Sequence, residues 1–243
     1  MILPNVRASF GREEANAILG ILGDGDSATR ESATQRLIEG GIDSLLDDPR
    51  TLNGVLTGDH AVPPALVFYL LVRHALLESG IDDRTLADYL AAMLAEFGRE
   101  DRAYRIQPDD PDRFFYLVDL LAAMETPDGR RRFLVRAHLG NFALWLSGIF
   151  PDHVVARVHR RGAPGIDYME AMGASGYRMA ADSPFATQHG LQDVYRTAAD
   201  TFPTLRVALN GIADRYLFPT RARSIDRLIR QVGDAFESGH STP

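Results

Sequence analysis

The hydrophobic positions of this chain recur every three to four residues over most of its length, with breaks at clusters of Gly, Pro and Asp. This spacing is typical of α-helices, and we find no convincing alternation of apolar and polar residues of the kind that marks a half-buried strand. The pattern therefore predicts an all-α fold, a globular multi-helix bundle of about ten helices. We expect residues 1–243 to form a single helical domain around two or three buried central helices.

Two of the predicted helices are apolar on nearly every side. The first covers residues 64–79, and the second lies in "RFLVRAHLGNFALWLSGIF", where residues 139–150 are almost wholly apolar. A helix that is apolar all round is buried in a core. Residues 82–99 carry one apolar stripe instead, which predicts a peripheral amphipathic helix. No membrane span is expected, because Arg136 and Pro151 bracket far fewer than the roughly 20 apolar residues that a spanning helix needs.

The most polar stretch, "REDRAYRIQPDDPD", covers residues 99–112 and predicts a long loop between two strong helices. If the chain has a subdomain break, we expect it near 99–112. The next stretch, "DRFFYLVDLLAAME" (residues 112–125), is strongly apolar and predicts a further helix.

Residues 165–182 predict a helix that contains Gly173 and Gly176. Each glycine costs about 1 kcal/mol relative to alanine in a helix interior, so we expect a packing reason, namely the close approach of another helix. Tyr168, Met172 and Met179 follow helical spacing in the same segment. Methionine stripes mostly fill cores, and they also line cavities that adapt to apolar ligands.

Two pairs of polar residues interrupt the apolar helices. His74 and Glu78 are four residues apart, and His138 and Asn141 are three apart beside Trp145, the only tryptophan. Each pair has an ordinary structural explanation, an ion pair at a helix end or a core hydrogen bond, because buried polar groups need partners. If the two helices pack together, these five residues would form one polar pocket, the candidate ligand site.

Composition excludes several chemistries. All 26 basic residues are arginine and there is no cysteine, so Schiff-base lysines, phosphate-loop lysines, thiol nucleophiles, thiolate metal sites and disulfides are ruled out. The zinc-protease motif His-Glu-x-x-His and the hydrolase motif Gly-x-Ser-x-Gly are also absent. No metal site is predicted, no catalytic residue is assigned, and the cofactor, if any, is unknown.

The segments "LGNFALWLSGIFPDHV" (residues 139–154) and "GIDYMEAMGASGYRMA" (165–180) resemble stretches shared by an uncharacterised group of bacterial all-helical proteins. The resemblance covers roughly an eighth of the chain. It implies a bacterial source, and it carries no activity, cofactor or site residue.

Three functions stay open at this point. The first is a binding protein for an apolar small molecule or a protein partner, and the second is a metal-assisted or acid–base enzyme using the His/Glu/Asn pocket. The third is a regulator that binds nucleic acid through Arg223, Arg227 and Arg230, although the net charge of −7 argues against nucleic acid. The N-terminus shows no export signal, so we expect a cytoplasmic protein. A homodimer would be consistent with the apolar helices.

Overall fold

The computed structural model describes residues 1–23, 25–58, 62–99 and 101–219. These residues form thirteen α-helices and no strand, which confirms the all-α prediction. The number exceeds the expected ten because short helices, such as those at Asp43–Leu46 and Pro184–Gln188, are too brief to show a period. The chain divides into two compact units, Met1–Ala103 and Tyr104–Pro243, and this division lies within the polar stretch 99–112.

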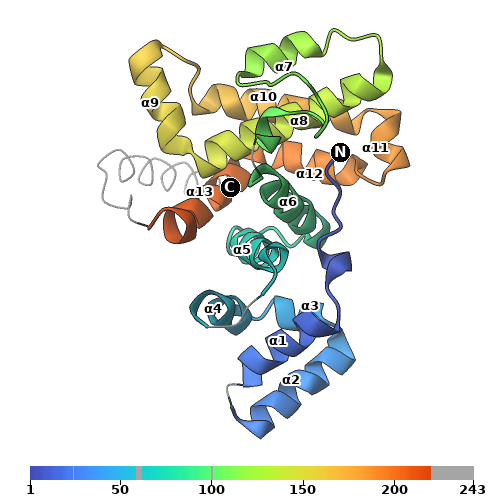
Figure 1. The fold of residues 1–243 in the computed structure, drawn as a ribbon, viewed down its shortest axis with the longest axis vertical. Coiled ribbons are helices and arrows are strands. Elements are labelled where there is room, and N and C mark those ends of the chain that lie inside the picture. The colour runs from blue at the N-terminus through green and yellow to red at the C-terminus, as the bar shows by residue number, and fades with distance from the viewer. Residues whose placement is uncertain (24, 59–61, 100, 220–243) are drawn as a thin grey trace, which may run out of the picture. The chain divides into compact units, whose positions relative to one another are not determined.

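Unit 1 contains six α-helices (Figure 1). They are α1 (Arg12–Gly23), α2 (Ser27–Gly40), α3 (Asp43–Leu46), α4 (Pro49–Thr57), α5 (Pro64–Glu78) and α6 (Arg84–Phe97). Aspartates begin several of them: the Asp26 side chain accepts a hydrogen bond from Thr29 N, and Asp83 accepts from Thr85 N and Leu86 N. These contacts satisfy backbone N–H groups that a helix start leaves without partners.

The core of unit 1 contains α5 and α6, which pack against each other. The prediction of a peripheral α6 is wrong, because every residue from Leu86 to Leu94 is buried. Between Leu86 and Leu94, the side opposite the apolar stripe carries alanines, which are small enough to pack closely, and one polar residue, Asp88. The Asp88 carboxylate accepts a hydrogen bond from Arg7 N at 3.0 Å, so the N-terminal segment covers that side of the helix.

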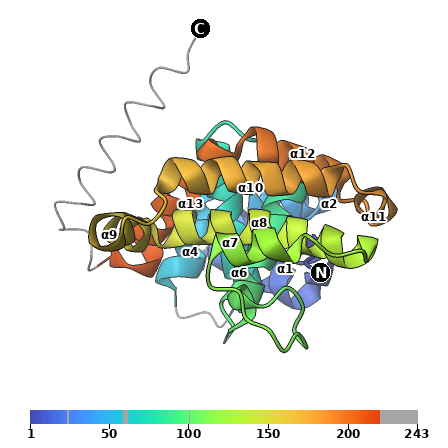
Figure 2. The same ribbon diagram turned by 90° about the horizontal axis from the view of Figure 1, so that it is seen from above.

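Unit 2 contains the remaining described α-helices, and a short π-helix, Ala213–Leu217, follows the last of them. The α-helices are α7 (Leu117–Ala123), α8 (Gly129–Ile149), α9 (Pro151–Arg161), α10 (Ile166–Ala181), α11 (Pro184–Gln188), α12 (Gln192–Asp200) and α13 (Phe202–Ile212). α8 lies at the centre of this unit and contacts α7, α10 and α13 (Figures 1 and 2). Its burial confirms the expectation from its apolar circumference.

The two glycines of α10 lie where this helix crosses α8. A Cβ atom added at Gly176 would be 2.9 Å from both Arg136 O and Gly140 N, and one added at Gly173 would be 2.9 Å from Ala143 Cβ. Gly173 lies near Ala143 and Gly176 near Gly140, so residue numbers rise along α10 while they fall along α8. The two helices are therefore antiparallel, and Figures 1 and 2 show them side by side. The predicted close helix approach is confirmed: α8 lies against both glycines, and the Phe202 ring of α13 lies against Gly173.

The apolar stretch 112–125 is helical only from Leu117 to Ala123, so the prediction of a longer helix is wrong. Tyr116 has extended backbone angles, and Phe114 N donates to Tyr104 O at 2.7 Å, which ties the preceding residues to the start of unit 2. Phe115, Tyr116 and Val118 are 47%, 48% and 64% exposed. The segment therefore displays apolar side chains at the surface.

α9 turns sharply away from α8, from which it is separated only by Phe150. Of the helices that the structure describes, none alone is long and apolar enough to cross a membrane, and α8 and α9 meet that test only as a pair bent by 91°. α9 ends at Arg161 and is followed by Gly162, which adopts a left-handed conformation with φ 58°. This conformation, which glycine adopts without strain, reverses the chain and leads Ala163 and Pro164 back toward α10.

Candidate functional site

His74 and Glu78 both lie on α5 in unit 1. His74 is buried, and its Nε2 is 3.0 Å from the carbonyl oxygen of Leu46, whereas Glu78, one turn further along the helix, is exposed. The His74 ring is thus used to join α5 to the end of α3. This is the structural explanation that the sequence left open for it.

His138, Asn141 and Trp145 lie on α8 in unit 2. Asn141 is buried, and its Oδ1 accepts a hydrogen bond from the Tyr177 hydroxyl of α10 at 2.8 Å. The His138 ring stacks on Phe142 with centroids 6.2 Å apart, and Trp145 lies 5.9 Å from the same ring. Asn141 therefore serves the contact between α8 and α10, and the two aromatic side chains support Phe142.

The five residues of the predicted pocket fall into the two different units. A pocket shared by His74, Glu78, His138, Asn141 and Trp145 stays a prediction. None of the five lines the two adjoining pockets of unit 2 that α8, α9 and the residues before α7 help to form.

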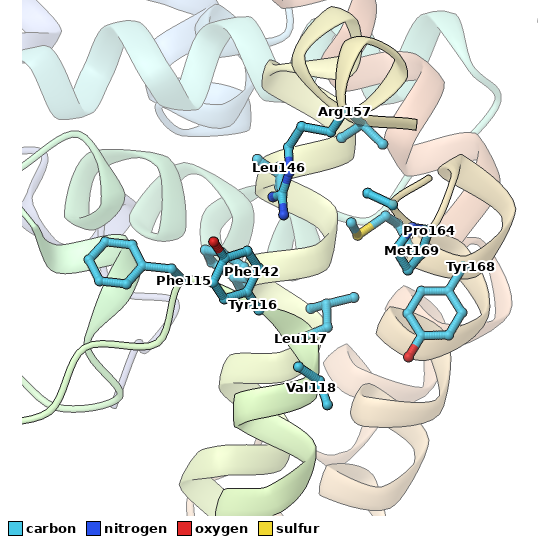
Figure 3. A pocket seen from close by; sticks show the side chains of 12 residues that line it. Phe115, Tyr116, Leu117, Val118, Phe142, Leu146, Arg157, Pro164, Tyr168 and Met169 are labelled. Atoms are coloured by element: carbon cyan, nitrogen blue, oxygen red, sulfur yellow. The ribbon is translucent and has the colours of Figure 1, made fainter. Parts of the chain in front are cut away.

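The first of these pockets is an apolar cavity with a volume of about 120 Å³. Side chains from α8, α9, α10, the 115–118 segment and the turn after α9 surround it (Figure 3). They are Phe115, Tyr116, Leu117, Val118, Phe142, Leu146, Val154, Arg157, Ala163, Pro164, Tyr168 and Met169. Arg157 is the only charged residue among them. We call this space the apolar lobe.

The second pocket adjoins the first and has a volume of about 360 Å³. It shares Phe115, Tyr116, Phe142, Leu146 and Arg157 with the apolar lobe, so the two spaces form one groove with a common wall. Its further lining residues are Tyr104, His153, Ala156 and Arg160. We call this space the basic lobe.

Arg157 lies at the junction of the two lobes. Its guanidinium carbon is 5.0 Å from the centroid of the Tyr116 ring, a cation–π contact. In Figure 3 the side chain extends from α9 toward Tyr116 and Phe142, while Pro164 and Met169 lie on the α10 side of the cavity. The positive charge is thus held at the edge of an otherwise apolar space.

An aromatic cluster positions the wall of the groove. Tyr104 lies 4.8 Å from Phe115 between ring centroids, and 6.1 Å from both Phe142 and Trp145. Offset and edge-to-face contacts at these separations add to the stabilisation from buried area. The extended segment before α7 is therefore fixed against α8, with two exposed rings at the mouth of the groove.

Sequence reasoning missed Phe115, Tyr116 and Arg157 as site residues. The two aromatic residues were assigned to a helix, in which they would have packed inward with the apolar residues of α7. A signal for Arg157 was present, because His153, Arg157 and Arg160 are spaced four and three residues apart and so share one face of α9. Tyr168 and Met169 belong to the segment whose methionines were expected to fill a core or line a cavity.

Unit 1 contains a cluster of charges around Arg73, which is only 1% exposed. Its Nε donates to Asp47 Oδ1 at 2.7 Å and its Nη2 to Asp82 Oδ1 at 2.6 Å, and Arg84 Nη2 also donates to Asp47 at 2.6 Å. The hydrogen bond to Asp47 raises the pKa of Arg73 despite the opposing effect of burial. Because the charges compensate one another, this cluster stabilises the contacts among α3, α5 and α6.

Across residues 1–23, 25–58, 62–99 and 101–219, no three His, Asp or Glu side chains gather closely enough to hold a metal ion. The arginines expected to contact nucleic acid, Arg223, Arg227 and Arg230, lie outside the described residues. Comparisons with protein-family models, curated proteins and solved structures give no match for this chain. The groove is accordingly interpreted from its own geometry.

Proposed function

We propose that unit 2 binds an apolar small molecule in the groove formed by α8, α9, α10 and the 115–118 segment. The observation that carries this proposal is the apolar lobe, a cavity of about 120 Å³ walled by aromatic and aliphatic side chains from separate elements. Ligand sites are typically concave and mostly apolar, with a few polar groups that orient the ligand. The lobe has this character, with Arg157 as the polar group.

The size of the lobe limits the apolar part of the ligand. Buried apolar cavities of about 150 Å³ accept benzene. The apolar lobe therefore suits one phenyl ring or a short branched or linear alkyl group. The exposed rings of Phe115 and Tyr116 extend the apolar surface beyond the cavity and would cover the ligand from the solvent side.

Methionine methyl groups offer a direct test, because the chain has six methionines and Met169 lines the cavity. We expect titration of the ¹³C-methyl-methionine-labelled protein with 4-phenylbutan-1-ol to shift the Met169 resonance, assigned through Met169→Leu. Met93, fully buried in α6 of unit 1, serves as the internal control and should not shift.

A pair of variants separates the cavity from general surface adsorption. Ala163→Leu adds three carbon atoms at the cavity wall and should abolish the Met169 shift. Ala122→Leu places the same side chain on an exposed position of α7 outside the cavity and should leave the shift intact. The proposal fails if Met169 does not respond, or if it responds equally in both variants. A silent Met169 would favour the other expected occupant, a protein partner docking on Phe115 and Tyr116.

A further inference from the structure

We propose that the ligand of this groove carries an anionic group, a carboxylate, which binds Arg157 while its apolar part fills the apolar lobe. This inference rests on the proposed function and specifies the chemical class of the ligand. The ligand class is a small amphipathic carboxylate, such as an arylalkanoate or a medium-chain fatty acid. Three observations support it: the position of Arg157, the charges that line the groove, and the partition of the groove into two lobes.

The guanidinium of Arg157 is suitably placed for such a contact. Its carbon lies over the Tyr116 ring, 5.0 Å from the ring centroid, and its N–H groups project from the edges of the guanidinium plane. Those edges match the two oxygens of a carboxylate, and the paired hydrogen bonds are stronger than those between neutral groups. Because Arg157 lines both lobes, a ligand whose apolar end fills the first lobe brings its polar end to this side chain.

The charges along the groove have one sign. Arg157 and Arg160 supply these charges from a face of α9 that they share with His153, and neither lobe is lined by an aspartate or glutamate among the described residues. In unit 1, by contrast, the buried Arg73 is paired with two carboxylates of the protein itself. Arg160 also lies near the C-terminus of α9, where the helix dipole already favours a cation. That explanation does not extend to Arg157, which lies about one turn before Arg160 in α9 and lines the cavity.

The basic lobe completes the arrangement. Its volume of about 360 Å³ leaves room for a hydrated carboxylate beside Arg157. The chain as a whole has a net charge of −7, so the positive lobe is a local feature of an acidic protein. We expect the anion to be recognised at short range, and raised salt to weaken binding of the carboxylate without affecting a neutral analogue.

The test compares 4-phenylbutyrate with 4-phenylbutan-1-ol, two probes that share the ring and chain and differ in the charged head group. Affinities are measured by isothermal titration, and the Met169 methyl resonance reports whether binding occurs in the groove. We expect the carboxylate to bind on the order of tenfold more tightly than the alcohol, the difference typical of a hydrogen bond to a charged group.

Arg157→Met should remove this preference, because the carboxylate loses its charged partner while methionine keeps an apolar stem in the wall, so the readout is the ratio of the two affinities measured in each variant. Arg157→Gln, which keeps a polar head without charge, should behave in the same way. Arg196→Met removes an exposed arginine of α12 in the same unit and should leave the preference intact. Retained alcohol binding in each variant shows that the groove is still folded.

The possible failures are distinguishable. Equal affinities for the two probes, both shifting Met169, would leave the binding function standing and overturn the anionic ligand. A preference for the carboxylate that survives in Arg157→Met, or that shifts no Met169 signal, would also overturn it. If neither probe shifts Met169, the binding function itself fails and this inference fails with it.

Discussion

Replacement of Gly176 by alanine tests the close contact between α8 and α10. In an open helix this change would stabilise the protein by about 1 kcal/mol, because alanine has the higher helix propensity. In this structure the new Cβ would lie 2.9 Å from Arg136 O and 2.9 Å from Gly140 N, both backbone atoms of α8. Backbone atoms cannot rotate away as a side chain can, so the two helices must separate.

The size of the effect follows from that separation. Favourable contacts between carbon atoms lie at about 3.5–4.0 Å, and a gap of about 0.5–1 Å forfeits a quarter to a half of the dispersion energy of the atoms that line it. Overpacking of this kind costs about 1–3 kcal/mol, and at a position blocked by two backbone atoms we expect the upper end. After subtraction of the propensity gain, Gly176→Ala should destabilise unit 2 by about 2 kcal/mol.

The sole tryptophan provides the assay, because Trp145 lies on α8 and its fluorescence reports the unfolding of unit 2. A loss of about 2 kcal/mol should lower the Tm by roughly 4–8 °C in a unit of this size. Gly211→Ala in α13 is the matched control, since its nearest neighbour would be the end of a flexible side chain, Arg215 Nη2, at 3.4 Å. The control should be neutral or slightly stabilising. A Tm of Gly176→Ala equal to or above the Tm of Gly211→Ala would refute the close contact.

Two further predictions concern buried polar groups. Tyr177→Phe should destabilise the protein by about 1–2 kcal/mol in urea unfolding, because the hydroxyl that donates to Asn141 is lost, whereas Tyr69→Phe should be neutral or stabilising. Tyr69 is fully buried, and burial raises its pKa to about 12. Its hydroxyl finds no hydrogen-bond partner among the described residues. Equal losses in the free energy of unfolding for the two variants would contradict this reasoning. The hydrogen bond from Arg50 lowers the pKa of Asp48 below its ordinary 3.8, so Asp48 stabilises unit 1 above that pH and this contribution is lost as the pH falls further. Asp48→Asn retains a side chain that can cap the helix. Its Tm, followed by circular dichroism, should therefore lie below that of the parent protein at pH 6, and the two Tm values should lie closer together near pH 2. A Tm difference that is the same at both pH values would count against the ion pair.

Much of the fold could be predicted from local patterns. The apolar circumference of residues 64–79 and of the 139–150 stretch indicated buried helices, and α5 and α8 are buried. The two glycines of α10 indicated a helix crossing, although their partner could not be named. α6 was predicted to be peripheral because its apolar residues form a single stripe. Only the tertiary structure shows that α5 packs against this helix and that Arg7, 81 residues from Asp88 in the sequence, covers the side that carries Asp88.

The candidate site was less predictable. The polar residues of the apolar helices were conspicuous in the sequence, yet His74 and Asn141 are engaged in contacts within their own units. The groove is built mainly from aromatic and aliphatic side chains, which in the sequence look the same as core residues. Phe115 and Tyr116 became site residues because the backbone before α7 is extended, a conformation that the hydrogen bond between Phe114 and Tyr104 supports.

The sequence by itself determined the all-α class, the buried helices α5 and α8 and the exclusion of lysine and thiol chemistry. These properties depend on composition and on the spacing of apolar residues, which are local. Only the tertiary structure decided which surface of α8 is covered and which is hollow, because a cavity arises where side chains from distant segments meet without filling the space. Arg157 and Met169 are twelve positions apart, and they line one cavity only because the chain reverses at Gly162.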